Sequence, residues 1–369
     1  MSKFLDSLTG YFFSGSTASQ GNGHLGRVPG DTPADGNTAA ARANDSADRS
    51  IDSRDDSRDD DAEVPLRLRD RLLLRKAVQR QTPNYSRSMT ARRPWGDATS
   101  ASPRIHPLAS IDPRADLAPD VEVGPFCVIG PDVSIGPGCR LMNNVTIVGH
   151  TVIGSDNVFF PNAVIGADPQ DLKYRGEDAR LIIGDSNHFR ENVTVHIGTA
   201  TGSGETRIGS GNLLMVNCHV GHDAIIGDGC VLANNVMLAG HVHIGNRVSM
   251  MGGAGVHHFV SIGDFAFVAG YAQVTHDVPP YVKVDEENHV RAVNVIGLRR
   301  GLAITDEDIA ALEVAVRHLF ISKKQPMSTK IAAMLADENL NSKVREVVDS
   351  IRRRALGRHG RYLEGQRKA

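Results

Sequence analysis

Residues 105–129 read IHPLAS IDPRAD LAPDVE VGPFCV I, and an aliphatic residue stands at every sixth position of this stretch. Ile105, Ile111, Leu117 and Val123 each open a group of six residues, a hexad. A period of six is neither the 3.6 residues of a helix nor the simple alternation of a strand, so each hexad is expected to be a short strand followed by a turn. This spacing predicts a solenoid of hexapeptide units.

The same register continues far beyond the first hexads. One block runs to residue 165, a second covers residues 183–195, and a third covers residues 208–274. Three hexads close one triangular coil, so residues 18 apart should lie above one another at the strand spacing of about 4.8 Å. The large residue at the first position of a hexad and the small residue at the fifth should both point inward. We therefore predict an all-β domain over residues 101–281, a parallel β-helix of hexapeptide repeats.

The four cysteines follow this register. No CxxC pair and no Cys/His zinc spacing occurs, and the nearby pairs are 12 residues apart, which places them on different faces of the coil. We expect all of them to fill the small inward position, without a disulfide or a reactive thiol. They are Cys127, Cys139, Cys218 and Cys230.

The chain changes character on both sides of the repeat. Residues 1–100 are predominantly polar and include the run DSADRSIDSRDDSRDDD at residues 45–61, which predicts a disordered extension. The basic, leucine-rich residues 65–78 either make a weak contact with an anionic membrane surface or are simply solvated. Residues 282–301 are expected to be a connector, and residues 302–369 a small α-helical domain that covers the last coil.

The C-terminal helices carry recognisable signals. Thr305 is a candidate N-cap because three acidic residues follow it directly. A second helical pattern follows Ser328, with apolar residues from Ile331 to Ile351.

Charge and hydropathy exclude several classes of function. The 41 basic and 43 acidic side chains give a net charge of -2, which provides no general affinity for nucleic acid. No apolar run approaches the roughly 20 residues needed to cross a bilayer, and the N-terminus does not resemble a signal peptide. We expect a cytoplasmic protein without a transmembrane segment.

A closed β-helix has no internal pocket, so function is expected where the repeat is interrupted or where polar residues share a register. The interruptions should be inserted loops near residues 168–180 and 200–206. Histidines gather in the third block of hexads, at His219, His222, His241, His243, His257 and His258.

The 18-residue coil predicts how these histidines lie relative to one another. Gly240 should lie one coil above His222 and His258 two coils above it, while His241 should lie above Asp223. A carboxylate beside a histidine can support a general base, and a glycine between two histidines allows close approach to the backbone. Alternatively, the histidines are surface residues at corners with no partner.

Several short motifs surround these histidines in a fixed order. The most specific are Gln170-Asp171-Leu172-Lys173-Tyr174 and Asn217-x-His219-x-x-His222-Asp223. The others are Ala233-Asn-Asn235, Leu238-Ala-Gly-His241-Val242, Val256-His257, Asp277-Val-Pro-Pro-Tyr281 and Asn294-x-x-Gly297-Leu298-Arg299-Arg300. Over residues 105–320 the chain resembles the acyl-[acyl-carrier-protein]:UDP-N-acetylglucosamine O-acyltransferases, which open lipid A biosynthesis.

The resemblance implies a left-handed coil, a homotrimer with active sites between neighbouring subunits, and no metal or other cofactor. It implies that His222 takes the proton of the glucosamine 3-hydroxyl, which attacks the thioester of a 3-hydroxyacyl chain on acyl carrier protein. Asp223 would orient the imidazole, and the backbone N–H of Gly240 would stabilise the oxyanion. The substrate-binding positions that match are Gln170, Asp171, Lys173, His219, His241, His257, His258, Gly270, Asn294, Arg299 and Arg300.

Two regions bear on the acyl donor. Gly270 matches the position that limits the acyl groove in the family, which favours a long chain; alternatively, it serves a corner that needs positive φ. The acidic acyl carrier protein is expected to meet a set of arginines in the C-terminal region, although these arginines could also be simply solvated. They are Arg352, Arg353, Arg354, Arg358 and Arg361.

The chain departs from the family at three places. His258 stands where the family usually has Gln, the loop between Tyr281 and Asn294 is one residue shorter, and Arg299-Arg300-Gly301 is one residue short of the usual motif. The resemblance therefore says less about which residues contact the nucleotide than about the catalytic centre at His222.

Three other interpretations use the same residues. An N-acyltransferase acting on a UDP-amino sugar would share the repeat, although the loop at residues 170–174 argues for the O-acyltransferase. A metal enzyme of the γ-carbonic anhydrase kind could use His219, His222 and His241 as ligands. A non-catalytic scaffold would need neither the His/Asp column nor the lysine-bearing loop.

Overall fold

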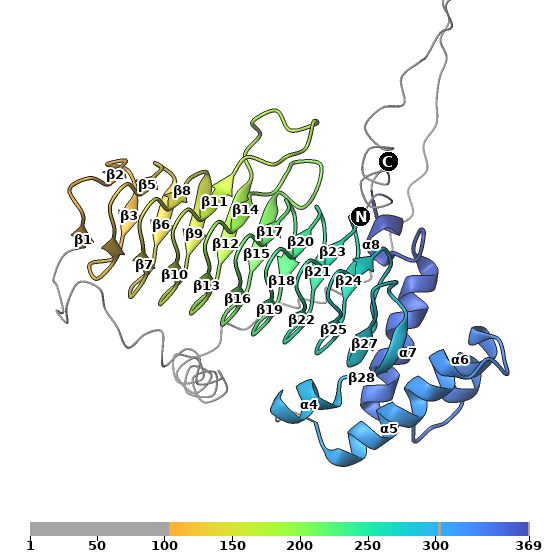
Figure 1. Cartoon of the computed structure of the whole chain (residues 1–369). Helices are drawn as coiled ribbons and strands as arrows, with labels where there is room; N and C mark the ends of the chain where they lie inside the picture. The colour runs from red at the N-terminus through yellow and green to blue at the C-terminus, as the bar shows by residue number, and fades with distance from the viewer. Residues whose placement is uncertain (1–102, 302–303, 368–369) are drawn as a thin grey trace, which may run out of the picture. The chain divides into compact units, whose positions relative to one another are not determined.

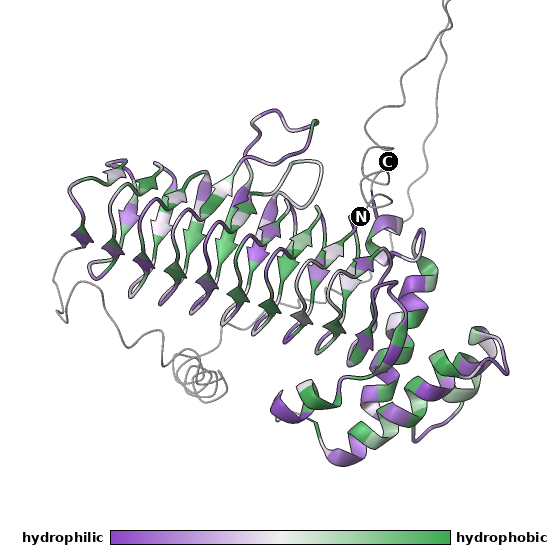
Figure 2. Cartoon of the chain, in the orientation of Figure 1, coloured by the Kyte–Doolittle hydropathy of each residue, from purple (hydrophilic) through white to green (hydrophobic). Residues whose placement is uncertain are grey.

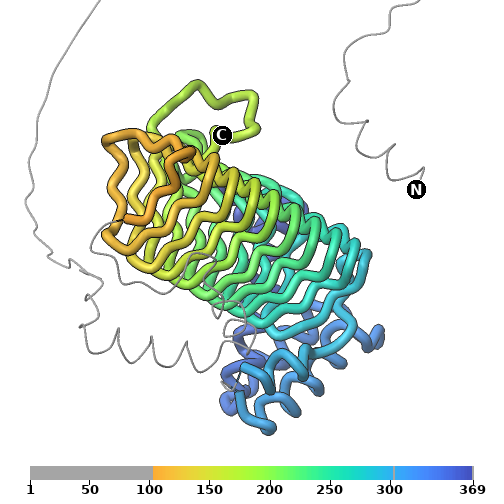
Figure 3. Tube along the Cα trace, turned by 60° about the vertical axis from the view of Figure 1, so that its left-hand side comes forward, coloured from red at the N-terminus to blue at the C-terminus, as the bar shows by residue number. Residues whose placement is uncertain are grey.

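In the computed structural model, which describes residues 103–301 and 304–367, short parallel strands stack into three sheets (Figure 1). Consecutive strands belong to the three sheets in turn, so the backbone winds in successive coils (Figure 3). The predicted fold class is confirmed: the chain forms a left-handed parallel β-helix with a small C-terminal helical region. The expectations for residues 1–100 lie outside the described residues.

Sheet A has eleven strands. In sheet order they are β1 (Arg104–Ile105), β4 (Glu122–Val123), β7 (Arg140–Leu141), β10 (Val158–Phe159), β13 (His188–Phe189), β16 (Leu213–Leu214), β19 (Val231–Leu232), β22 (Ser249–Met250), β25 (Phe267–Val268), β27 (Val282–Val284) and β28 (Val290–Val293). Only β28 runs antiparallel to its neighbour, so it ends the parallel stack.

Sheets B and C complete each coil. Sheet B contains β2 (Ser110–Ile111), β5 (Val128–Ile129), β8 (Thr146–Ile147), β11 (Val164–Ala167), β14 (Thr194–His196), β17 (His219–Val220), β20 (Met237–Leu238), β23 (Gly255–Val256) and β26 (Gln273–Val274). Sheet C contains β3 (Asp116–Leu117), β6 (Val133–Ile135), β9 (His150–Ile153), β12 (Arg180–Ile183), β15 (Glu205–Ile208), β18 (Ile225–Ile226), β21 (His243–Ile244) and β24 (Ser261–Ile262).

Strand pairing follows the 18-residue register, as in the pair Ile226 and Ile244. Across the two interruptions the paired residues are further apart. Ile153 pairs with Ile183 at a separation of 30, and Ile183 pairs with Ile208 at a separation of 25. The extra residues form loops 168–179 and 197–204, and the register of the strands resumes after each loop.

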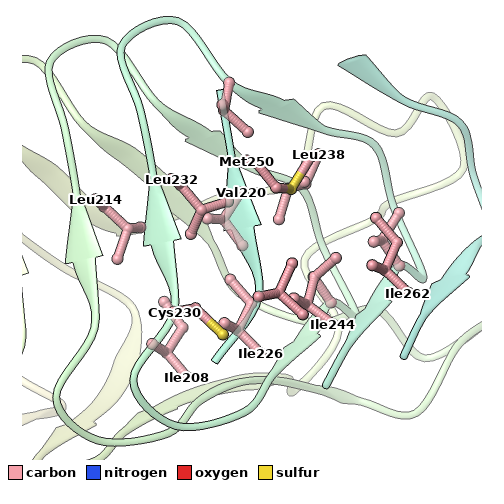
Figure 4. Close-up of a cluster of buried hydrophobic side chains, with 14 of the residues drawn as sticks. Ile208, Leu214, Val220, Ile226, Cys230, Leu232, Leu238, Ile244, Met250 and Ile262 are labelled. Carbon is pink, nitrogen blue, oxygen red and sulfur yellow. The ribbon is translucent and has the colours of Figure 1, made fainter. Parts of the chain in front are cut away.

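The interior of the β-helix is filled by the first and fifth residues of each hexad (Figure 4). Ile226 and Leu232 are first-position residues with 2% and 1% exposure, and Cys230 is a fifth-position residue with 1%. Figure 2 shows hydrophobic residues recurring along the strands from coil to coil. Burying one such aliphatic side chain contributes roughly 1.5–3 kcal/mol.

The packing role predicted for the cysteines is confirmed. All four are buried and none forms a disulfide. Burial raises the pKa of the Cys230 thiol to about 12, so it stays protonated and unreactive.

A column of buried asparagines occupies the fifth position in three successive coils. The Asn187 amide donates to Asn157 Oδ1 at 3.0 Å and to Gly209 O at 2.9 Å, and its own Oδ1 accepts from Asn212 N at 2.9 Å. These bonds link the coils on both sides of loop 168–179 and loop 197–204. The column therefore holds the strands in register where the repeat is interrupted.

The helical region contains α4 (Val295–Gly301), α5 (Asp306–Val316), the π-helical turn η1 (Arg317–Ile321), α6 (Met327–Leu335), α7 (Ser342–Leu356) and α8 (Tyr362–Gly365). The predicted N-cap is confirmed: Thr305 and Asp308 form a reciprocal capping box. The second predicted pattern is corrected, because it divides into two helices. Asn341 accepts from Lys343 N and Val344 N, so a new helix must begin there.

The helices pack on the last coil, as expected. Leu298, Leu312 and Val347 belong to the same buried cluster as the strands. Tyr281 donates a hydrogen bond to Glu346 on α7. Covering this end protects strand edges that would otherwise be open to pairing with another chain.

Within the described residues, no helix combines the length and apolar character needed to span a bilayer.

We expect Asn187→Ala to lower the free energy of unfolding by about 2–6 kcal/mol, because it leaves the buried Gly209 carbonyl and Asn212 N–H without partners at about 1–3 kcal/mol each. Chemical denaturation monitored by circular dichroism measures the change. Asn234→Ala, at an exposed position, is the matched control and should change stability by no more than about 0.5 kcal/mol. Equal effects of the two substitutions would show that the buried column does not stabilise the fold.

Candidate functional site

Both inserted loops and the histidine cluster lie on one edge of the β-helix, where the chain passes from sheet B to sheet C. Loop 168–179 follows β11, loop 197–204 follows β14, and His222 follows β17. His241 follows β20 and His258 follows β23 in the next two coils. We call this line of corners the histidine edge. The 18-residue register brings these residues together although they are distant in the sequence.

His222 and Asp223 form a buried pair on this edge. His222 Nδ1 lies 2.8 Å from Asp223 Oδ2, and the two residues are 7% and 2% exposed. Asp223 adopts a left-handed backbone conformation with φ of 57°, which is uncommon for a residue other than glycine. The alternative interpretation of histidines without partners is therefore wrong for His222.

Loop 197–204 surrounds the Asp223 carboxylate with donors. Thr199 donates from its N–H to Oδ1 at 3.1 Å and from its hydroxyl to Oδ2 at 2.7 Å, and Ser203 N donates to Oδ1 at 2.9 Å. A Cβ at Gly202 would lie 2.3 Å from the carboxylate carbon, so only glycine fits there. The sequence analysis missed Thr199 and Ser203; the signal was the small, hydroxyl-rich loop in the coil directly below Asp223.

These donors determine the charge of Asp223. Burial by itself would raise the pKa of the carboxyl, but the hydrogen bonds from His222 and Thr199 outweigh it, and the pKa lies below its ordinary value. The ionised carboxylate accepts the Nδ1–H of His222. In the neutral imidazole, Nε2 is then the nitrogen without a hydrogen, which is what a general base requires.

Gly240 lies directly above the His222 ring. A Cβ on Gly240 would come within 2.5 Å of His222 Nε2, so a side chain here would displace the imidazole. In the described part of the chain, the Gly240 N–H donates to no acceptor. A backbone N–H without an acceptor, on a residue next to the His222 ring, is a candidate donor to an anionic oxygen.

His241 extends the cluster by one coil. Its ring stacks edge-on with His222 at 4.9 Å, and its Nδ1 lies 3.8 Å from Asp223 Oδ2. On its other side it stacks face to face on Phe259, with ring centroids 4.4 Å apart. Burial lowers the pKa of His241 to about 4, so this histidine is neutral near pH 7.

Two further histidines lie near the pair: His219 on β17, in the same coil as His222, and His196 on β14, one coil below. His219 Nδ1 is 2.8 Å from the Thr194 hydroxyl, and its ring packs edge-on against His196 at 4.8 Å. His196 is 5% exposed, and its Nδ1 has no hydrogen-bond partner in the part of the chain that the structure describes. Burial lowers the pKa of His196 to about 4, with a smaller contribution from the charge of His219. His196 was not among the predicted site residues because it lies before the third block of hexads, in which the other histidines gather.

The first inserted loop comes close to the top of the cluster. Gln170 and Lys173 are exposed, and Asp171 Oδ1 accepts from Lys173 N at 2.9 Å. Burial lowers the pKa of His258, whereas the charge of Asp171 acts to raise it, so the two side chains are close enough to interact. His257 is exposed beside His258, and the two rings are 5.6 Å apart.

The other predicted substrate-binding residues are not on the histidine edge. Gly270 follows β25, at a corner between sheets A and B. Asn294 is buried, with its amide bonded to Phe265 O at 2.9 Å and to Gly297 N at 3.2 Å. Arg299 and Arg300 are exposed on α4. A single chain therefore does not bring the whole predicted set together, and the roles of these residues remain predictions.

The three predicted metal ligands do not form the tightest cluster on this edge. Among the described residues, the group with ligand atoms within 4.8 Å of one another is His222, Asp223 and His241, without His219. Both Asp223 oxygens already accept hydrogen bonds from loop 197–204, and the His222 Nδ1–H is directed at Asp223. The arrangement therefore favours a hydrogen-bonded base over a metal enzyme of the γ-carbonic anhydrase kind.

Comparisons with known proteins agree with this geometry. A family profile described as bacterial transferase hexapeptide (six repeats) matches residues 205–240, and one described as UDP N-acetylglucosamine O-acyltransferase, domain 2, matches residues 277–359. Together, the fold and these matches define a hexapeptide-repeat transferase.

Individual relatives identify the family. The acyl-[acyl-carrier-protein]--UDP-N-acetylglucosamine O-acyltransferase of Stenotrophomonas maltophilia (strain R551-3) is 46% identical over 226 residues, 61% of this chain and 86% of that protein. The enzyme of the same name from Myxococcus xanthus (strain DK1622) is 45% identical over 221 residues, 60% of this chain and 85% of that protein. The chain belongs to the acyl-[acyl-carrier-protein]--UDP-N-acetylglucosamine O-acyltransferase family.

Solved structures show the same fold. LpxA from Acinetobacter baumannii is 40% identical with a TM-score of 0.63, covering 66% of this chain and 95% of that chain. The UDP-N-acetylglucosamine acyltransferase LpxA from Bacteroides fragilis is 38% identical with a TM-score of 0.64, covering 67% of this chain and 96% of that chain. The resemblance inferred from the motifs is thereby confirmed.

The buried neutral histidines predict that acid destabilises the fold. His196 and His241 have a pKa of about 4 in the folded chain, against an ordinary value of 6.5. The unfolded chain binds more protons between these values, so the free energy of unfolding should fall as the pH falls from about 6.5 toward 4. Denaturation midpoints measured across this range test it. His196→Gln should flatten the dependence, and an unchanged slope in that variant would show that His196 is not held neutral.

Proposed function

We propose that this protein transfers a 3-hydroxyacyl chain from acyl carrier protein to the 3-hydroxyl of UDP-N-acetylglucosamine, the first step of lipid A biosynthesis. The observation that carries the proposal is the His222–Asp223 pair next to the Gly240 N–H, which has no acceptor among residues 103–301 and 304–367. Membership in the O-acyltransferase family supplies the substrates, as the names of the relatives state them.

The geometry suggests how the reaction proceeds. His222 Nε2 takes the proton of the sugar hydroxyl as its oxygen bonds to the thioester carbonyl carbon. The carbonyl oxygen becomes negative and accepts the Gly240 N–H, while Asp223 stabilises the imidazolium. The C–S bond then breaks, and the leaving thiolate receives the proton from His222. The products are the acylated sugar and the free thiol of the carrier.

Substrate binding is divided between the histidine edge and other surfaces. Gln170, Asp171, Lys173, His219, His241, His257 and His258 would contact substrate on that edge. Gly270 lies at another corner, Asn294 lies between β28 and α4, and Arg299 and Arg300 lie on α4. A neighbouring copy would present these residues to the same substrates. We therefore propose a homotrimer with sites between subunits, which accounts for the incomplete set in one chain.

The acyl carrier protein is the proposed macromolecular partner. Arg361 is 8% exposed and donates to Thr275 O at 2.7 Å, and burial lowers the pKa of Arg354. The structure therefore reduces the predicted basic surface to Arg352, Arg353 and Arg358, which are exposed. These three remain available to an acidic carrier. We place the reaction in the cytoplasm, where acyl carrier proteins and nucleotide sugars are found.

His222→Ala should leave the fold intact and lower kcat by about 10²–10⁴-fold, because it removes the general base. The assay incubates the protein with UDP-N-acetylglucosamine and 3-hydroxyacyl carrier proteins and identifies the products by mass spectrometry. His188→Ala, on the outward face of β13, is the matched control and should retain kcat. Near wild-type kcat in His222→Ala would contradict the assignment.

Gly270→Met should shift the enzyme toward shorter acyl chains. Gly270 has no positive φ, so the alternative of a corner that requires glycine is wrong, and a Cβ there would lie 3.3 Å from Gly252 O. Each methylene group that is excluded from an apolar groove loses about 0.8 kcal/mol of binding free energy. Competition between long and short acyl carrier substrates measures the ratio of their kcat/KM values, which should invert. A uniform fall for all chain lengths would indicate a structural role instead.

A further inference from the structure

The C-terminal segment of the chain returns to the histidine edge. Asp277, at the last corner of that edge, donates from its N–H to Gly360 O at 2.9 Å and accepts from Tyr362 N at 2.8 Å. Arg361 Nη1 donates to Thr275 O at 2.7 Å, and the Arg361 guanidinium also pairs with Glu364. These bonds fix α8 beside the last coil, one coil above His258 and Phe259.

Beyond α8, Arg367 lies against the histidine cluster. Its guanidinium carbon is 5.7 Å from the centre of the Phe259 ring, a cation–π distance. The same ring stacks on His241, with ring centroids 4.4 Å apart and an interplanar angle of 5°. A continuous series of contacts therefore runs from Arg367 through Phe259 to His241. The ring centroid of His241 lies 4.9 Å from that of His222.

The charge of Arg367 is exposed and not neutralised within the described chain. It forms no ion pair with a described residue, and its N–H makes only a 3.4 Å contact with Glu364 O. Burial is the largest cause of the low pKa of His241, and the charge of Arg367 lowers it further, so that charge acts at the cluster. Arg361 and Tyr362 hold the tail in place without Arg367, which argues against a purely structural role.

An exposed guanidinium that lies over a ring and has no carboxylate partner among the described residues can use its planar N–H donors for a phosphate oxygen. Both substrates of the proposed reaction carry phosphate esters. One is the diphosphate of the nucleotide sugar, and the other is the phosphodiester of the pantetheine arm of the carrier.

We propose that Arg367 binds a phosphate group of a substrate at the histidine edge, with Phe259 as the platform that holds its guanidinium there. This inference rests on the proposed function. It assigns a substrate-binding role to the C-terminal tail, which lies beyond the repeat and outside the motifs that indicated the family.

The test is the steady-state kinetics of Arg367→Gln in the full-length protein. The KM of the substrate whose phosphate Arg367 binds should rise about 10–150-fold, the range expected when a hydrogen bond to a charged group is lost. The other KM should stay within about twofold. Arg367→Lys should recover part of the loss, because lysine keeps the charge without the planar fork. Arg345→Gln, the same charge change at an exposed residue of α7, is the control and should change neither KM.

Matched ligands identify the phosphate. If the diphosphate is bound, Arg367→Gln should raise the Ki of UDP and leave the Ki of uridine unchanged. If the carrier arm is bound, the loss should appear with a 3-hydroxyacyl phosphopantetheine thioester and vanish with the pantetheine thioester that lacks the phosphate. Phe259→Leu should raise the same KM by a smaller factor.

Unchanged KM values in Arg367→Gln, or equal losses for ligands with and without phosphate, overturn the proposal. The wild-type protein is assayed in parallel, so a failure of the proposed function appears separately, as an absence of acyl transfer in the wild type.

Discussion

The vertical stacking of coils at 18-residue intervals is the constraint on which the rest of the structure depends. It fills the interior with one large and one small side chain per hexad, and it also decides which polar residues meet outside. His222 contacts Gly240 and His241 only because each turn of the helix returns the chain to the same edge. A slip of one residue in any coil would turn the inward side chains outward and separate the pair from its neighbours.

The interruptions show how the protein adds chemistry to a regular fold. Loop 197–204 leaves the coil, supplies Thr199 and Ser203 to the Asp223 carboxylate, and returns in register at β15. A buried carboxylate is costly unless it is fully hydrogen-bonded, and these donors hold it ionised beside His222. The buried asparagines hydrogen-bond the coils below and above loop 197–204 to one another. The strands on both sides of the loop therefore stay in register, and the donors to Asp223 keep their positions.

The helical region has two physical roles that the repeat cannot fill. It covers the last coil, where strand edges and apolar side chains would otherwise be exposed. It also carries charge to places that the coil does not reach: the exposed arginines of α7, and Arg367 at the end of the tail. Asp277 lies at a corner of the histidine edge and also accepts a hydrogen bond from Tyr362 N. It therefore holds α8, and with it Arg367, beside that edge.

The sequence by itself determined the fold class, the inward packing of the cysteines and the alignment of His222, Asp223, Gly240 and His241, because a strict period of six turns sequence separation into spatial position. It also supplied the N-cap at Thr305, which is a local signal. Only the tertiary structure decided what lies outside that period. The donors to Asp223 come from a loop whose path no periodicity describes, and two of the C-terminal arginines bind backbone or lie buried beside Asp277 because of how the helices dock. Arg367 reaches Phe259 for the same reason: long-range packing brings the end of the chain to an edge that was built a hundred residues earlier.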